Sequence, residues 1–246
     1  MKSIEEVAHK YRSLRFNSIG EALADLLRQA EENEVPYLEF ADMLVEHEQK
    51  MRNQKRIDFN RRKASFPTQK HLEGFDFRFQ TTITKRQVNR LLTFEFIENR
   101  ENVIFIGPPG VGKTHLAIGI GVKAVDAGYK VLFQTALELV ESLELAELKG
   151  ELKKKITSLL KFDLLIIDEL GYLPMSKRSV YNLFQLINSV YEYRSMIITT
   201  NKEFTAWGEF FHDENVAVPI VDRLIHHSHI FMLGGESYRL REKLGN

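Results

Sequence analysis

The chain has 246 residues, 43% of them hydrophobic, with 34 basic and 34 acidic side chains and no cysteine. The lack of cysteine excludes disulfides, cysteine-ligated zinc and thiol catalysis. No run of 18 apolar residues is present, and the first residues, MKSIEEVAHK, lack the apolar core of a signal peptide. We therefore expect a soluble, cytoplasmic protein without membrane contact, built as one medium domain plus a small one.

Charge is distributed unevenly near the N-terminus. Residues 1–49 carry eleven acidic and five basic side chains, whereas residues 50–63 carry seven basic and one acidic. A basic segment beside an acidic one suggests contact with nucleic acid or a partner, although a solvated helix face is the commoner explanation. The candidate DNA-binding or inter-subunit residues here are Lys55, Arg56, Arg61, Arg62 and Lys63.

Residues 1–68 are predicted to form a small all-α domain. Ser3 with Glu6, and Ser18 with Glu21, have the spacing of capping boxes at helix N-termini. Pro36 favours the start of a further helix, which could continue through the basic stretch to residue 63. A proline and a glycine then interrupt the pattern at positions 67 and 74, so we place the domain boundary near residue 68.

Residues 69–246 show strands alternating with helices. The predicted strands are the apolar runs at 103–106, 131–134, 164–167, 196–199 and 229–233, and longer helical stretches separate them. This alternation predicts a three-layer α/β fold with a five-stranded parallel sheet and helices on both faces.

A phosphate-binding P-loop, G-x-x-x-x-G-K-[ST], follows the first of these strands without a mismatch. Its glycines let backbone N–H groups approach a polyphosphate, and the helix that follows adds a favourable dipole. Lys113 is expected to reach the β- and γ-phosphates of ATP or ADP, and the Thr114 hydroxyl to bind Mg²⁺. A Gly-rich turn that matches by chance is the alternative. The candidate nucleotide-binding residues are Gly107, Pro108, Pro109, Gly110, Val111, Gly112, Lys113, Thr114 and His115.

Two carboxylates follow the apolar run at 164–167. Ligand sites of open parallel sheets lie at the carboxyl ends of the strands, where Asp168 and Glu169 would stand. Asp168 is a candidate Mg²⁺ ligand, together with Thr114. Glu169 is the candidate residue that orients and polarises the water attacking the γ-phosphate.

The P-loop, an added strand and a Glu beside the magnesium-binding Asp resemble the additional-strand ATPases, including the AAA+ group. In that resemblance Asn201, which ends the run Ser195–Thr200, corresponds to the sensor-1 residue that contacts the γ-phosphate or the attacking water. The alternative is that Asn201 caps the next helix. Arg239 could be a sensor-2 arginine, but the chain ends seven residues later, so the resemblance implies a reduced C-terminal lid.

Arg223 follows sensor-1 in the order and at the distance of an arginine finger. The resemblance implies that such a residue reaches the ATP of a neighbouring subunit and neutralises charge in the transition state. Its alternative is an intrachain ion pair with Asp222 or Glu214, and Arg178 is the reserve candidate. Lys113, Asp168, Glu169, Asn201 and Arg223 are thus the expected catalytic set.

The segments GPPGVGKT, LLIIDELGYLP, ITTN and VDRL together resemble the IstB/DnaC-like ATPases over essentially the whole chain, and the transposition-helper branch most closely. The resemblance implies an ATPase, slow as an isolated subunit, that oligomerises on duplex DNA with ATP at subunit interfaces and helps a partner transposase. It assigns oligomerisation, DNA or partner binding to residues 1–68 and the AAA+ ATPase domain to residues 69–246.

Relatives that act in replication carry an added helix between the second and third strands that contacts DNA, and the matching stretch here is 137–161. Lysines suit phosphate contacts, although a solvated helix end would also explain them. The candidates in this stretch are Lys149, Lys153, Lys154 and Lys155. Two other functions remain open at this point, a DnaC-like loader of a replicative helicase and a nucleotide-dependent interaction module without catalysis.

Overall fold

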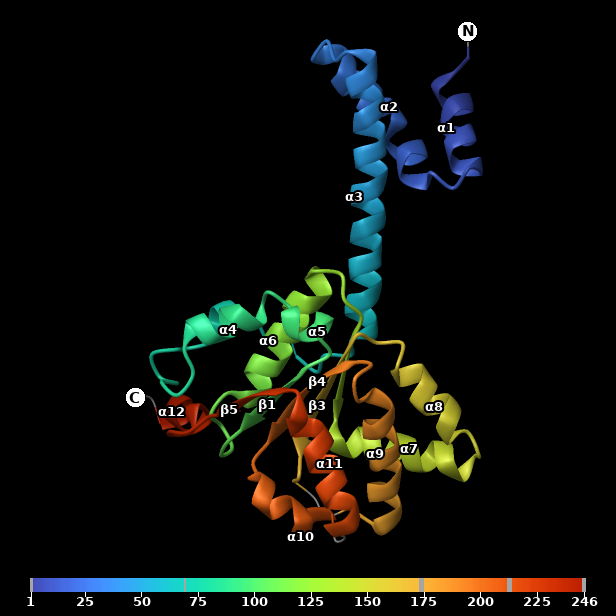
Figure 1. Ribbon diagram of the computed structural model, residues 1–246. Helices are drawn as coiled ribbons and strands as arrows, with labels where there is room; N and C mark the ends of the chain where they lie inside the picture. Colours follow the sequence, from blue (N-terminus) through green and yellow to red (C-terminus); the bar gives the residue numbers. More distant parts are fainter. Residues whose placement is uncertain (1, 69, 173–174, 212–213, 245–246) are drawn as a thin grey trace. The chain divides into compact units, whose positions relative to one another are not determined.

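The computed structural model describes residues 2–68, 70–172, 175–211 and 214–244 (Figure 1). The chain forms two compact units, Met1–Phe59 and Asn60–Asn246. Among the described residues, no helix is both long enough and apolar enough to cross a membrane.

The first unit is helical, as predicted. It contains α1 (Ile4–Ser13), α2 (Asn17–Glu32) and most of α3 (Tyr37–Lys63). Apolar side chains from all three helices form its core: Ala8, Ile19, Leu23, Leu26 and Leu44. The capping box of Ser3 and Glu6 is present at the start of α1.

The second expected capping box is wrong. α2 begins at Asn17, and its N-cap residue, Phe16, makes no side-chain cap, so Ser18 lies inside the helix. The buried Glu48 of α3 accepts a hydrogen bond from the Ile19 N–H at 2.9 Å instead. A carboxylate from another helix therefore satisfies a donor of the α2 N-terminus, where negative charge is also favourable.

The unit boundary falls within α3, earlier than the expected position near residue 68, because the end of α3 belongs to the second unit. The Asn60 side chain donates to the Gly128 carbonyl at 3.3 Å, and Arg61 pairs with Asp126. After the helix, the Ala64 carbonyl accepts from the Phe133 N–H at 2.8 Å. These contacts attach residues from 60 onward to the sheet domain.

All five predicted strands are confirmed, as β1 (Asn102–Ile106), β2 (Val131–Thr135), β3 (Leu164–Leu170), β4 (Ser195–Thr200) and β5 (Ser228–Met232). They form one parallel sheet in the order β2-β3-β4-β1-β5. Although β2 lies between β1 and β3 in sequence, β4 is the strand inserted between them in space. The carboxyl ends of β1, β4 and β3 are therefore neighbours.

Helices cover both faces of this sheet, which confirms the three-layer P-loop AAA+ fold (Figure 1). Leu165, Ile167 and Ile198 point to one face and pack with residues of α7, α9 and α11. Ile166 points to the other face, toward Gly121 of α6. The helices and 3-10 turns of this unit are η1 (Leu72–Gly74), α4 (Lys85–Leu91), α5 (Glu95–Glu98), α6 (Lys113–Asp126), α7 (Ala136–Leu148), α8 (Leu152–Leu159), α9 (Lys177–Val190), η2 (Phe204–Ala206), α10 (Trp207–Phe211), α11 (Glu214–His226) and α12 (Tyr238–Leu244).

Candidate nucleotide-binding site

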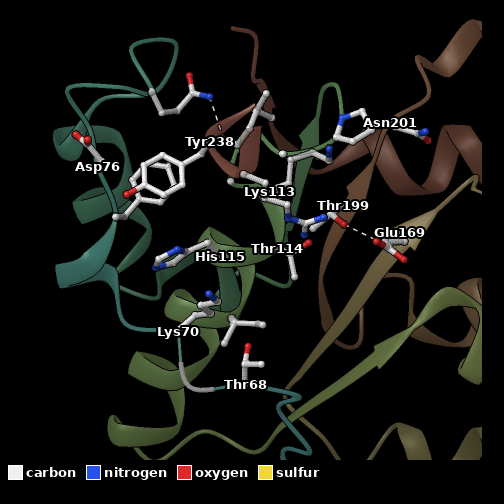
Figure 2. A pocket seen from close by; sticks show the side chains of 18 of the residues that line it. Thr68, Lys70, Asp76, Lys113, Thr114, His115, Glu169, Thr199, Asn201 and Tyr238 are labelled. Carbon is white, nitrogen blue, oxygen red and sulfur yellow. Dashed lines mark hydrogen bonds between the residues drawn. The ribbon is translucent and has the colours of Figure 1, made fainter. Parts of the chain in front are cut away.

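The P-loop connects β1 to α6 and borders a cavity of about 540 Å³ (Figure 2). Its first N–H, from Gly107, donates to the Thr200 carbonyl of β4 at 3.1 Å, which fixes the loop against the neighbouring strand. Gly112 stands at the N-cap of α6 with φ +99°, a conformation that L residues with side chains rarely adopt. The loop therefore ends at the N-terminus of α6, and the N–H groups of a helix N-terminus can bind an anion.

Lys113 is the first residue of α6, directly after the P-loop glycines, and it lines the cavity. Its ammonium group donates to the Gly107 carbonyl at 2.6 Å and to the Pro108 carbonyl at 2.8 Å. Burial lowers the pKa of Lys113 and the positive charge of Arg239 lowers it further, while Asp168 and Glu169 partly oppose the shift. The Lys113 side chain is thus close enough to the carboxylates at the end of β3 and to the Arg239 guanidinium for their charges to interact.

Thr114 and the end of β3 are joined directly. The Thr114 hydroxyl donates to Asp168 Oδ1 at 2.9 Å, and the buried Thr199 hydroxyl donates to the same oxygen. Thr199 also accepts the Glu169 N–H at 2.9 Å. One hydroxyl on β4 therefore holds both carboxylate residues of β3 in place, a role that the sequence reasoning missed.

Glu169 leaves the regular strand. The β3–β4 register shifts between Ile167 and Leu170, and Glu169 has φ +63°. Its side chain is exposed on the cavity wall, whereas Asp168 is 5% exposed. This strained conformation turns the second carboxylate away from the sheet and into the cavity, next to the P-loop.

Asn201 lines the same cavity, directly after β4 (Figure 2). Its side-chain oxygen is buried and has no hydrogen-bond partner among the described residues. The following turn, η2, has Glu203 as its N-cap, so Asn201 does not cap it. A buried amide without a partner in a ligand cavity fits a group that a bound molecule or water would satisfy.

Arg223 is not among the described residues that line the cavity, whereas Lys113, Glu169 and Asn201 are. It lies on α11, where its guanidinium donates to the Pro219 carbonyl at 3.1 Å and stands 5.4 Å from the centre of the Phe184 ring. Among the described residues no ion pair joins Arg223 to Asp222, and the Glu214 side chain lies outside them. The reserve candidate, Arg178, pairs with Glu147 at 2.7 Å.

Further residues of the cavity come from the segments before α4 and after β5. Tyr238 and Arg239 reach it from α12, and Phe75 contacts the His115 ring, with 5.4 Å between ring centres. The short chain segment before α4 adds Lys70 and Asp76, which line the opposite wall from Glu169 (Figure 2). Arg239 had a sequence signal, its place after the last strand, whereas Tyr238, Lys70 and Asp76 had none.

The expected Mg²⁺ ligands fit a magnesium ion in their chemistry. Thr114 and Asp168 offer a hydroxyl and a carboxylate oxygen within one hydrogen-bonded pair, and such hard oxygen donors suit this ion. Among the described residues there is no cluster of three or more acidic or histidine side chains that could hold a metal. An ion at this position would therefore take its remaining ligands from phosphate and water.

The candidate DNA-binding lysines between β2 and β3 lie on two helices, where one was expected. Lys149 is the exposed C-cap of α7, and α8 carries the other three. Lys153 is exposed, Lys154 pairs with Glu151 at 3.1 Å, and Lys155 is half-buried.

The second basic group, on α3, is divided between the two units. In the first unit Lys55 donates to Ser18 at 3.4 Å and Arg56 to Asn53 at 2.8 Å. In the second unit Arg61 pairs with Asp126, and Arg62 and Lys63 are exposed.

Comparison with known proteins identifies the family. A family model described as IstB-like ATP binding protein matches residues 9–246. A protein of insertion sequence IS21 from Pseudomonas aeruginosa, named for ATP binding, is 44% identical over 230 residues, or 94% of this chain and 87% of that protein. Its counterpart from IS5376 of Geobacillus stearothermophilus is 42% identical over 241 residues, or 98% of this chain and 96% of that protein.

Solved structures share the fold at lower identity. The DnaC helicase loader aligns with a TM-score of 0.53 and 21% identity over 67% of this chain and 96% of that chain. DnaA from Aquifex aeolicus, bound to AMPPCP, aligns with a TM-score of 0.54 and 21% identity over 72% of this chain and 55% of that chain. Because the family model and both insertion-sequence relatives span nearly the whole sequence, this chain belongs to the IstB-like ATP-binding proteins.

Proposed function

We propose that this chain is an ATPase that assembles on duplex DNA when ATP is bound and helps or regulates a partner transposase. One observation carries the hydrolytic part of this proposal. Glu169 projects into the cavity that Lys113 and Thr114 border, beside an Asp168 that is already hydrogen-bonded to Thr114. A protein that only binds nucleotide has no need of a second, exposed carboxylate held there by a strained backbone.

The chain's own groups can divide the work of hydrolysis. Lys113 and the P-loop N–H groups bind the phosphates, and Glu169 orients a water and accepts its proton. The Asn201 amide, which lacks a partner among the described residues, positions that water or the terminal phosphate. Bound Mg²⁺, held by Thr114 and Asp168, would neutralise charge on the phosphates.

Arg223 supports a site shared between subunits. Its guanidinium lies on α11, in contact with Phe184, and is not among the described residues that line the chain's own cavity. An arginine finger acts on a neighbour's ATP, so the proposal places nucleotide at the contact between two copies. Hydrolysis by an isolated subunit is then slow, because the transition state lacks this charge.

We propose duplex DNA and a transposase as the partners for two reasons. Exposed lysines at the end of α7 and on α8 suit the phosphate backbone, which supplies affinity without sequence information. The relatives that cover most of the chain are named for insertion sequences, elements that move by transposition. We assign the helical first unit to contacts with copies, DNA or partner, on the strength of its separation from the ATPase unit.

A Glu169→Gln variant tests the proposal. It keeps the side-chain shape but removes the carboxylate, so ATP binding and ATP-dependent assembly on duplex DNA persist while hydrolysis falls by about a hundredfold or more. Glu192→Gln is the matched control, since Glu192 is also exposed and has φ +62°. Hydrolysis that survives in Glu169→Gln would remove the catalytic assignment. Assembly on single strands alone would favour the helicase-loader function.

A further inference from the structure

The segment that follows β5 lies along the P-loop. The Leu233 N–H donates to the Ile106 carbonyl at 2.7 Å, and the Tyr238 N–H donates to the Gly110 carbonyl at 3.1 Å. The approach is close, since a Cβ at Gly110 would lie 2.1 Å from Ser237 Oγ. Residues 233–239, here called the C-terminal segment, are therefore packed against the loop and hydrogen-bonded to it.

Gln80 connects this segment to the P-loop through its side chain. Its amide nitrogen donates to the Val111 carbonyl at 3.0 Å and to the Gly234 carbonyl at 3.1 Å. Its oxygen accepts from the Thr82 N–H at 3.0 Å and from the Thr82 hydroxyl at 2.6 Å. Both donors and both acceptor positions of the carboxamide are thus used, in a residue only 4% exposed.

Thr82 completes the connection. Its hydroxyl donates to Gln80 and accepts the Gly234 N–H at 3.2 Å. Gly234 is therefore held at both its carbonyl and its N–H, by two neighbouring side chains of one short stretch. We call Gln80, Thr82, Val111 and Gly234 the Gln80 network.

The chain before Gln80 is itself fixed. Asp76 accepts the N–H groups of Arg78 and Phe79 at 2.9 and 3.1 Å, and its carbonyl accepts the Gln80 N–H at 3.0 Å. This turn presents the Phe79 ring to Tyr238, with 5.4 Å between ring centres. The turn thus contacts the C-terminal segment on one side while Gln80 reaches the P-loop on the other.

The C-terminal segment carries two side chains that line the nucleotide cavity, Tyr238 and Arg239 (Figure 2 labels Tyr238). Arg239 is close enough to Lys113 for their charges to interact. Lys113 is the residue that a P-loop directs at the β- and γ-phosphates. The position of Arg239 relative to the P-loop should therefore affect the binding of the same phosphates.

We propose that Gln80 is a positioning residue for ATP binding. Through Thr82 and the carbonyls of Val111 and Gly234, Gln80 holds Arg239 near Lys113 of the P-loop. The proposal rests on the proposed ATP binding. Gln80 does not touch the phosphates in this role; it acts through the C-terminal segment. Because Arg239 is a cation on the wall of the cavity that Lys113 also lines, we expect its displacement to weaken the binding of ATP more than that of ADP, which lacks the terminal phosphate.

A double-mutant cycle on the full chain tests this role. ATP and ADP affinities are measured for the wild type, Gln80→Leu, Arg239→Ala and the double variant. Each single change is expected to lower ATP affinity by about tenfold, and the double variant to lose little more than either, because both act on one contact. The control is Gln87→Leu, which removes an exposed capping amide that accepts from Thr84 and should leave both affinities unchanged.

The possible failures can be told apart. A wild type that binds no ATP would overturn the proposed function and the role of Gln80 with it. Wild-type ATP binding with additive losses in the cycle, or equal losses for ATP and ADP, would overturn the role of Gln80 alone. If Gln80→Leu lacks a cooperative unfolding transition, Thr82→Val replaces it in the same cycle, since it removes one hydroxyl from an exposed residue.

Discussion

The Thr199 hydroxyl on β4 donates to Asp168 Oδ1 on β3, and the same hydroxyl oxygen accepts the Glu169 N–H at 2.9 Å. Thr199 is fully buried within β4, the strand next to β3. Its hydroxyl therefore determines where the proposed magnesium-binding carboxylate stands and how the backbone turns at the proposed catalytic one.

Replacing Thr199 by valine keeps the shape of the side chain but removes this hydroxyl. The Glu169 N–H, in a part-buried hydrogen bond, then loses its acceptor, and Asp168 loses one of its donors. We expect kcat for ATP hydrolysis to fall by about tenfold or more with a smaller change in KM, and Thr199→Ser to retain activity. Thr93→Val, at an exposed hydroxyl that donates to the Arg90 carbonyl, is the control. An unchanged kcat in Thr199→Val would contradict this role.

Lys113 gives a prediction about pH. Because burial and Arg239 lower the pKa of Lys113, its neutral form becomes populated at a lower pH than for an ordinary lysine. ATP affinity should therefore decline as pH rises, starting below the ordinary lysine pKa of about 10.4. Lys113→Arg should remove the decline, since arginine stays charged, and Arg239→Ala should move it to higher pH. Titrations at several pH values decide this, and a wild-type affinity that is flat up to the ordinary pKa would contradict it.

The shared site predicts complementation between two inactive variants. Lys113→Ala subunits cannot hold nucleotide but still carry Arg223, whereas Arg223→Ala subunits hold nucleotide and lack the finger. Mixing them on duplex DNA creates contacts where an intact P-loop faces an intact arginine. ATP hydrolysis should thus rise above the sum of the separate variants. A mixture no more active than its parts would place Arg223 outside the catalytic site.

Glu48 gives a prediction about the first unit. Burial raises the pKa of Glu48, but hydrogen bonds from Ile19 and Arg52 outweigh it and lower the pKa overall. A carboxyl with a lowered folded pKa stabilises the fold above its unfolded pKa, and this contribution is lost as pH falls through the folded pKa.

Amide exchange at Ile19 in the full chain measures this effect. We expect exchange to be about tenfold faster in Glu48→Gln than in the wild type at neutral pH, because a charged acceptor becomes neutral. The difference should shrink in acid. Glu46→Gln, at an exposed position on the same helix, is the control. Equal exchange in wild type and Glu48→Gln would show that Glu48 does not stabilise the start of α2.

The sequence predicted the sheet because buried parallel strands are continuous apolar runs, and the P-loop because its residues are contiguous. Contacts between distant segments were not predictable in this way. Glu48 lies far along the chain from the helix start that it serves, so Ser18 looked like the better cap. Thr199 left a faint signal, as a polar residue near the end of a buried strand.

Other residues left no sequence signal at all. Gln80 lies in an irregular stretch without a motif, and its importance follows from its four hydrogen bonds. Tyr238 could not be placed at the cavity, because no sequence pattern shows that the chain after β5 returns along the P-loop. Arg223 is the reverse case. The sequence suggested a role for it, that of an arginine finger, but this role acts on a neighbouring subunit and cannot be seen in a single chain.

The most direct test of ATP-controlled assembly is the size of the complex on duplex and single-stranded DNA, with ATP, with ADP and without nucleotide. Sedimentation or mass photometry of the wild type and Lys113→Ala provides it. We predict higher-order assembly on duplex DNA with ATP, lost with ADP and in Lys113→Ala. Assembly on duplex that is equal in all nucleotide states, or tight binding to single strands alone, would contradict the account.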